Sequence, residues 1–207
     1  MNKNTDNRRN RRRIAAVLAG GLVVGVGTMA TLASWNDAEF AKSSFASGSF
    51  NMQGSSNGTD WGDHLGTSGA PAATLDFSAP VTHLSPTDAV YAPFSVRLGQ
   101  GSTYAADVSI SVADYSGSMG DTLSYAVYQT TDFGCSSSTD LGAAKSLVDS
   151  RTVQVENNVA SFELAKPDAD QAGAAANLCI VVTAGSSLVQ DTAGEITWQL
   201  YAASKNA

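Results

Sequence analysis

The chain has 207 residues and carries 19 acidic against 12 basic side chains, a net charge of −7. Half of the basic residues lie within the first 33 positions, so the remainder holds 18 acids against 6 scattered cations, a net charge of −12. A nucleic-acid partner requires clustered lysine and arginine, and this composition excludes that class. We interpret the acidity as that of a well-solvated exported surface and predict no cofactor and no metal site.

The N-terminus has the organisation of an export signal. Arginines between positions 8 and 13 precede an uncharged apolar run from Ile14 to Ala33. A basic start, an apolar stretch and a small residue at its end define such a signal. We predict a signal-peptide helix over 1–33 that is cleaved between Ala33 and Ser34. The chain would then contact the membrane only transiently, through this segment. A run of this length can also span a bilayer, which leaves an uncleaved anchor as an alternative, and the arginines leave a twin-arginine signal as another.

The segment 34–52 follows the signal and ends in an expected short strand. It precedes a stretch rich in glycine, serine and asparagine, 53–70, which we expect to be a flexible loop or linker. A strand on such a connection can pair with its own sheet or with the open edge of a neighbouring molecule. We therefore interpret 34–52 as a candidate donor strand, whose apolar residues include Phe45, Phe50 and Met52.

The remainder, 71–207, is dominated by an apolar-polar alternation of period two, which is typical of half-buried strands. Turn-forming residues separate the alternating segments. About nine short strands at this spacing predict one domain, an antiparallel β-sandwich, of which the jelly roll is one form. With the N-terminal strand, these segments are 45–52, 74–78, 94–98, 106–112, 123–130, 152–156, 159–164, 178–183 and 195–202.

Two segments of the mature chain have helical character. Residues 141–149 are a short candidate, and residues 168–176 are rich in alanine and follow Pro167, which suits a first helical turn. Neither has an apolar stripe long enough for a major core helix. The expected fold class is therefore all-β, with one or two short helices.

The two cysteines predict one disulfide. Cys135 lies in a polar stretch and Cys179 opens an apolar strand, and exported proteins meet oxidising surroundings. A bond between them would pin a loop to a strand. Two unpaired thiols are the alternative. A zinc site is disfavoured, because neither cysteine belongs to a CxxC pair and His64 and His83 are distant in sequence.

No catalytic constellation stands out. The chain contains no HExxH sequence, so His64 and His83 are interpreted as solvated loop residues. No GxSxG sequence occurs in a strand-to-helix context, and Asp168 and Asp170 are interpreted as solvated carboxylates. We predict no catalytic residues and no enzymatic activity.

The tryptophans raise a second hypothesis, a secreted adhesin or glycan-binding module. Trp198 alternates in phase with Ile196 and Leu200, so it is expected in the core. Trp61 lies between polar residues and is the better candidate for an exposed stacking ring. Its alternative role is that of a loop anchor packed on the sandwich.

Residues 27–52, GTMATLASWNDAEFAKSSFASGSFNM, carry a family resemblance. Trp35, Asn36 and Asp37, together with the segment from Phe45 to Gly48, resemble the start of the TasA and camelysin-like proteins. The likeness continues at 83–102, which is similar to a Leu-x-Pro-Gly-Asp segment with Thr87 in place of the glycine. Residues 195–204 resemble the closing strand of the family. Leu98 and Gly99 stand where the family has asparagines, and the cysteine pair is absent from its best-known member.

The resemblance implies both a fold and a function. Members of this family are biofilm-fibre proteins with a jelly-roll fold, exported with a SipW-type signal peptidase, that polymerise by lending the N-terminal strand of one subunit to the next. It implies a secreted structural protein of the extracellular matrix or cell surface of a Gram-positive-type bacterium, with itself and that peptidase as partners. Camelysin-type relatives have been called metalloproteases, which leaves that activity as a distant alternative.

Overall fold

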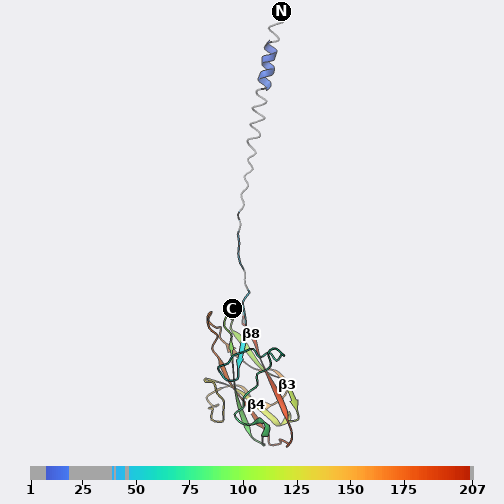
Figure 1. Ribbon diagram of the computed structural model, residues 1–207, viewed down its shortest axis with the longest axis vertical. Helices are drawn as coiled ribbons and strands as arrows, with labels where there is room; N and C mark the ends of the chain where they lie inside the picture. The colour runs from blue at the N-terminus through green and yellow to red at the C-terminus, as the bar shows by residue number, and fades with distance from the viewer. Residues whose placement is uncertain (1–7, 19–38, 40, 45–46, 206–207) are drawn as a thin grey trace, which may run out of the picture. The chain divides into compact units, whose positions relative to one another are not determined.

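The computed structural model describes residues 8–18, 39, 41–44 and 47–205 (Figure 1). The chain divides into two units, Met1–Ala46 and Ser47–Ala207. In the first unit, residues 8–18 form a helix that contains the arginine cluster and the beginning of the apolar run. The helical residues described here do not reach the length and hydropathy that a bilayer crossing needs. The expected cleavage site, the Trp35-Asn36-Asp37 motif and Phe45 lie outside the described residues.

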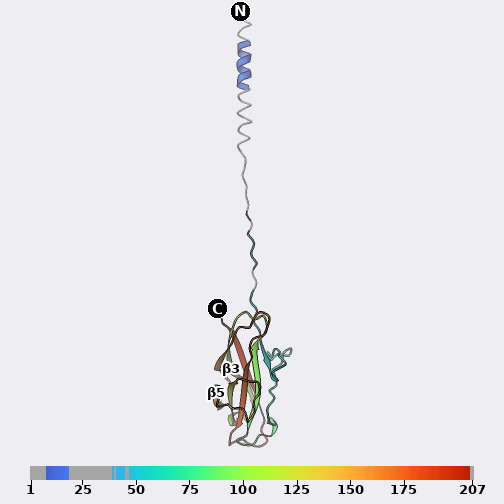
Figure 2. The ribbon, with the colours of Figure 1, turned by 90° about the vertical axis from the view of Figure 1, so that its left-hand side faces the viewer.

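The second unit is built from antiparallel β-strands, shown from two sides in Figures 1 and 2. One sheet has five strands in the order β1-β2-β7-β4-β5, and the other has three in the order β6-β3-β8. The elements are β1 (Met52–Ser55), the 3-10 helix η1 (Val81–His83), β2 (Ala89–Leu98), β3 (Ala106–Gly117), the 3-10 helix η2 (Gly120–Thr122), β4 (Leu123–Thr130), β5 (Lys145–Thr152), β6 (Glu156–Leu164), β7 (Ala176–Ala184) and β8 (Gly194–Ser204).

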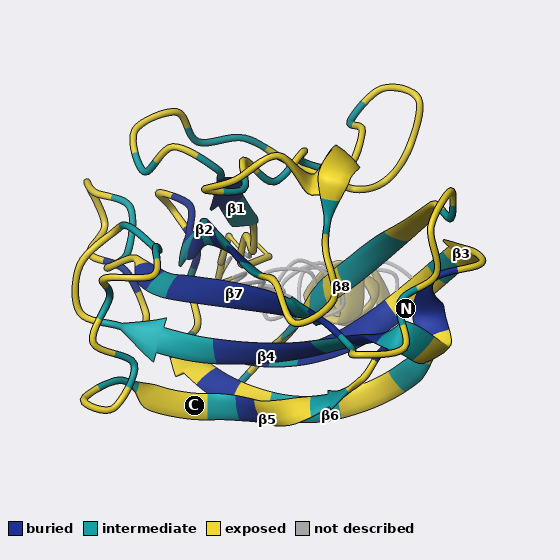
Figure 3. Cartoon of the chain, turned by 90° about the horizontal axis from the view of Figure 1, so that it is seen from below, coloured by how far each residue is buried: buried dark blue, intermediate teal, exposed yellow. Residues whose placement is uncertain are grey.

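A single apolar core contains residues of both sheets. The alternation in β3 puts Val108, Ile110 and Val112 inside, each at most 1% exposed. β7 and much of β4 are buried as well, as the dark blue in Figure 3 shows. Full burial of one such side chain stabilises the fold by roughly 1.5–3 kcal/mol. The expected all-β sandwich with alternating strands is therefore confirmed.

Two of the expected strands are wrong. Residues 74–78 form an irregular segment, although Leu75 and Phe77 pack against the core and the Ser78 N–H donates to the Tyr91 carbonyl at 2.8 Å. The apolar residues are turned inward as the alternation indicates, but no neighbouring strand pairs along the segment. Of the expected strand at 152–156, only the two ends are in strands, because Thr152 ends β5, Glu156 begins β6 and residues 153–155 connect them.

Both expected helices of the mature chain are wrong. Most of residues 141–149 lies in β5, which pairs with β4 at the end of the five-stranded sheet. Residues 168–175 are irregular, and their backbone finds a different partner, because the Gly173 N–H donates to the Leu98 carbonyl at 2.8 Å. Local helix propensity is weak enough for such tertiary pairing to override it.

The boundary between expected strand and expected linker is also wrong. β1 begins at Met52 and continues to Ser55, so residues 53–55 belong to the sheet. Gly54 and Gly62 then exchange two backbone hydrogen bonds, of 2.9 and 3.1 Å. The glycine- and serine-rich composition of 53–70 therefore includes a strand and a loop that is hydrogen-bonded to it.

Candidate functional site

The edge formed by β8 is the main candidate site. β8 pairs with β3 along one side and stands at the end of the three-stranded sheet. Among the described residues no strand pairs with its other side. An edge of this kind presents backbone N–H and C=O groups that another extended segment can bond.

The inward face of β8 is apolar but incompletely covered. Its residues pair with residues of β3 that include the fully buried Val108, Ile110 and Val112. The β8 residues themselves are only partly buried, as the teal in Figure 3 shows. The difference follows from position, because β3 has a strand on each side and β8 has one. An added strand would cover this apolar row, which consists of Ile196, Trp198, Leu200 and Ala202, opposite Tyr115, Val112, Ile110 and Val108.

Trp198 has the inward position expected from its alternation. Its ring meets that of Tyr125, in the opposite sheet, edge to face, with centroids 6.1 Å apart. Tyr125 is 1% exposed, and this burial raises the pKa of its phenol, which keeps the hydroxyl protonated. The pair joins the two sheets next to the open edge.

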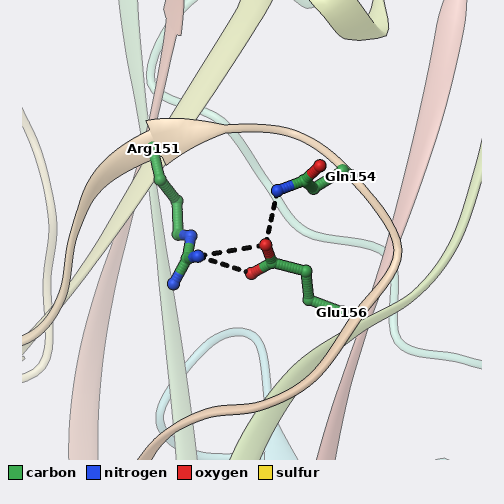
Figure 4. A network of polar contacts seen from close by, with 3 residues as sticks. All are labelled: Arg151, Gln154 and Glu156. Atoms are coloured by element: carbon green, nitrogen blue, oxygen red, sulfur yellow. Dashed lines mark hydrogen bonds and ion pairs between the residues drawn. The ribbon is translucent and has the colours of Figure 1, made fainter.

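The opposite edges of the two sheets are β5 and β6. β5 and β6 contact each other there, and an ion pair joins them (Figure 4). Arg151 Nη2 lies 2.8 Å from one Glu156 carboxylate oxygen and donates to the other at 3.0 Å, and Gln154 donates to the same carboxylate. This contact brings together the end of β5 and the start of β6, across the short connection between the two sheets.

The segment just before β1 is held by its own domain. The Gly99 N–H donates to the Asn51 carbonyl at 2.8 Å, and the Thr103 N–H donates to the Ser49 carbonyl at 2.9 Å. A side chain at Gly48 would collide with Thr103. The glycine of the family motif therefore has a steric role here, which is to let the backbone approach the loop after β2.

These contacts hold the C-terminal part of the candidate donor strand in its own molecule. Met52 pairs with Leu98 and packs against the core, while Phe50, between the hydrogen-bonded Ser49 and Asn51, is 39% exposed. Residues 48–55 thus form an anchor, and any segment free to reach a neighbour lies before it.

Trp61 is a loop anchor. The Arg97 guanidinium lies 4.1 Å above the ring centroid, and Arg97 Nε and Nη2 both donate to Gln53 Oε1 at 3.2 Å. One face of the indole is therefore occupied by a cation. This arrangement ties the loop after β1 to β2 and removes Trp61 as an open stacking platform.

The predicted disulfide is present. Cys135, in the loop between β4 and β5, is bonded to Cys179 in β7, with a Cα–Cα distance of 5.2 Å. As expected, it joins a surface loop to a strand, and that strand is central to the five-stranded sheet.

The histidines and aspartates that were weighed against catalytic motifs lie at the surface. His64 and His83 are both exposed, and His83 Nδ1 shares a 2.8 Å hydrogen bond with the neighbouring Thr82 hydroxyl. Asp168 and Asp170 are exposed as well. Across the described ranges, no three histidine, cysteine, aspartate or glutamate side chains are grouped as a metal site would require.

Comparison of the sequence with models of known families and with curated proteins finds no match. Function is therefore inferred from the geometry of this chain and from the resemblance at 27–52. The open edge of β8 was missed at the sequence level, because its residues alternate as they would in a strand paired on both sides.

Proposed function

We propose that this protein is an exported structural subunit that assembles into fibres of an extracellular matrix or cell surface. Each copy donates its N-terminal segment, 34–46, to the β8 edge of the next copy. The observation that carries this proposal is the β8 edge, with which no described strand pairs, and its partly exposed apolar row. Addition of an extended segment to such an edge combines backbone hydrogen bonds with burial of alternate side chains.

The strand order supports a jelly roll that lacks one strand. In an eight-stranded jelly roll the two sheets run 2-7-4-5 and 1-8-3-6. Here one sheet contains β2-β7-β4-β5 and the other β8-β3-β6, while β1 has joined β2. The position beside β8 is therefore the one that a first strand takes in the complete fold, and a donated segment would fill it.

The turn before β2 supports the family resemblance. Thr87, which stands where the family has glycine, has a φ of 75°, a left-handed conformation that favours glycine. The Asp88 carboxylate accepts from the Ser85 N–H at 2.8 Å, and the Asp88 N–H donates to the Ser85 carbonyl at 3.0 Å. The aspartate of the Leu-x-Pro-Gly-Asp segment thus closes the turn, and the glycine position needs the backbone that glycine provides.

The sequence of 34–46 suits a donor. It carries Trp35, Phe40 and Phe45, three large aromatic side chains within thirteen residues. Those of its residues that the structure describes, 39 and 41–44, are exposed. In an extended strand Trp35 and Phe45 share one face and Phe40 lies on the other. Pairing with β8 of another copy would therefore bury the rings of Trp35 and Phe45. Cleavage after Ala33 by a SipW-type peptidase would release this segment, which couples assembly to export.

Processing gives a direct prediction. The exported protein should begin at Ser34, because the signal ends in small side chains that fit a peptidase pocket. N-terminal sequencing of the protein recovered from the culture medium checks this. Replacing Ala33 with a bulky residue should block release, and a membrane-retained form that still carries Arg8 to Arg13 in the unaltered protein would contradict the assignment.

Strand addition can be tested with a peptide. A synthetic 34–46 peptide should bind the 47–207 domain and raise its melting temperature, with a stabilisation of about 2.7 kcal/mol when the free peptide is at 100 times Kd. The same peptide with Phe45→Asp should bind much more weakly, because it brings a charge to an apolar site. A melting temperature that neither peptide changes would argue against donation to this domain.

A further inference from the structure

The outer face of the three-stranded sheet contains a second feature, a shallow depression of about 450 Å³. It is open to solvent rather than enclosed. It is lined mainly by Asp107, Ser109, Asn158, Ser161 and Tyr201, with two alanines. We propose that this depression binds a neutral polysaccharide.

Tyr201 supplies the stacking surface. It is 62% exposed, and it is the most exposed aromatic side chain among the residues that the structure describes. Its neighbours in the depression include Ala203, whose side chain is too small to cover a ring. An exposed phenol ring with a polar tip suits the C–H face of a sugar, which is apolar while its rim is polar. Trp61 is less suited to stacking on a sugar than Tyr201, because the Arg97 guanidinium occupies one face of its ring.

Polar groups surround the ring in a regular arrangement. Ser161, Ser109 and Tyr201 form one row across β6, β3 and β8, since Ser109 is the register partner of both others. Asn158 adds an amide to the lining of the depression. It lies where the pairing between β3 and β6 is irregular, and its backbone is left-handed, with a φ of 54°. Hydroxyl and amide groups both donate and accept hydrogen bonds, as the hydroxyls of a sugar do.

The charge around the depression favours a neutral chain. Lys205 lies 2.9 Å from Glu163 and 3.3 Å from Asp107, so this neighbouring cation is already paired with two carboxylates. The side chains that line the depression include no cation. An anionic polysaccharide would meet net negative charge here, whereas a neutral one meets hydrogen-bonding groups and a ring.

The test uses affinity electrophoresis of the 47–207 domain, which contains all the described strands, the core and the disulfide. Gels contain mixed-linkage β-glucan, mannan, dextran or soluble starch, and a parallel gel contains polygalacturonate as the anionic comparison. We expect retardation by at least one neutral polymer. Tyr201→Ala should weaken it at least tenfold. Asn158→Gly, which keeps the left-handed backbone accessible, should weaken it severalfold.

Tyr104→Ala is the matched control, because Tyr104 is 39% exposed and does not line the depression. Its binding should equal that of the unaltered domain, and thermal melting establishes that each variant is folded. The proposal is overturned if none of the four neutral polymers retards the domain or if Tyr201→Ala binds normally. Equal losses in the Tyr104 and Tyr201 variants, or stronger retardation by polygalacturonate, overturn it as well. None of these outcomes depends on fibre assembly.

Discussion

Replacing Cys135 and Cys179 together with alanine is expected to lower the free energy of unfolding by about 2–4 kcal/mol. The bond closes a loop across a sequence separation of 44 residues, and its loss enlarges the conformational freedom of the unfolded chain. For a domain of this size, the melting temperature should fall by about 5–15 °C. Alanine is preferred to serine because Cys179 is fully buried, where a hydroxyl without a partner would add a separate penalty.

Denaturant unfolding of the oxidised protein and of the double variant measures this difference. The reduced form of the unaltered protein should unfold close to the double variant, and Cys135→Ala alone, at the half-buried end of the bond, should lose a similar amount. Equal stability of all forms, or labelling of two free thiols in the native exported protein, would refute the role given to the disulfide.

The parts of the fold that the sequence predicts well are those in which side-chain pattern and environment agree. The alternation at 106–112 and at 178–183 marks β3 and β7, both of which have a strand on each side. The disulfide was predictable because only two cysteines were present. The segment 141–149 has helix-favouring residues, yet most of it forms β5, because pairing with β4 outweighs a propensity of a few tenths of a kcal/mol per residue.

The candidate site was less predictable than the fold. Alternation indicates which face of a strand is buried, but it does not say which strand lies next to it. Neither the pairing of β1 with β2 nor the free side of β8 could therefore be obtained from residues 52–55 and 194–204 alone. The same limit explains why the sequence alone groups Phe50 and Met52 with Phe45 in one expected donor strand. The steric requirement at Gly48, which marks the start of the anchor, appears only when Thr103 is placed against it.

Removing residues 34–46 is expected to abolish filament formation while leaving a folded domain. The anchor 48–55 and the complete core remain, so the variant should keep cooperative unfolding and its disulfide. What it loses is the segment proposed to pair with β8 of the next copy. The effect should be all-or-none, because a chain of subunits grows only if every copy brings a donor.

Negative-stain electron microscopy of 34–207 and 47–207, purified in the same way and incubated at equal concentration, tests this most directly. The 34–207 protein with Phe45→Asp serves as a full-length control that retains the donor but places a charge in it. We expect regular filaments from 34–207, single particles from 47–207, and few or no filaments from the Phe45 variant. Filaments from 47–207 as abundant as those from 34–207, or a 34–207 protein that stays monomeric, would contradict assembly by strand donation.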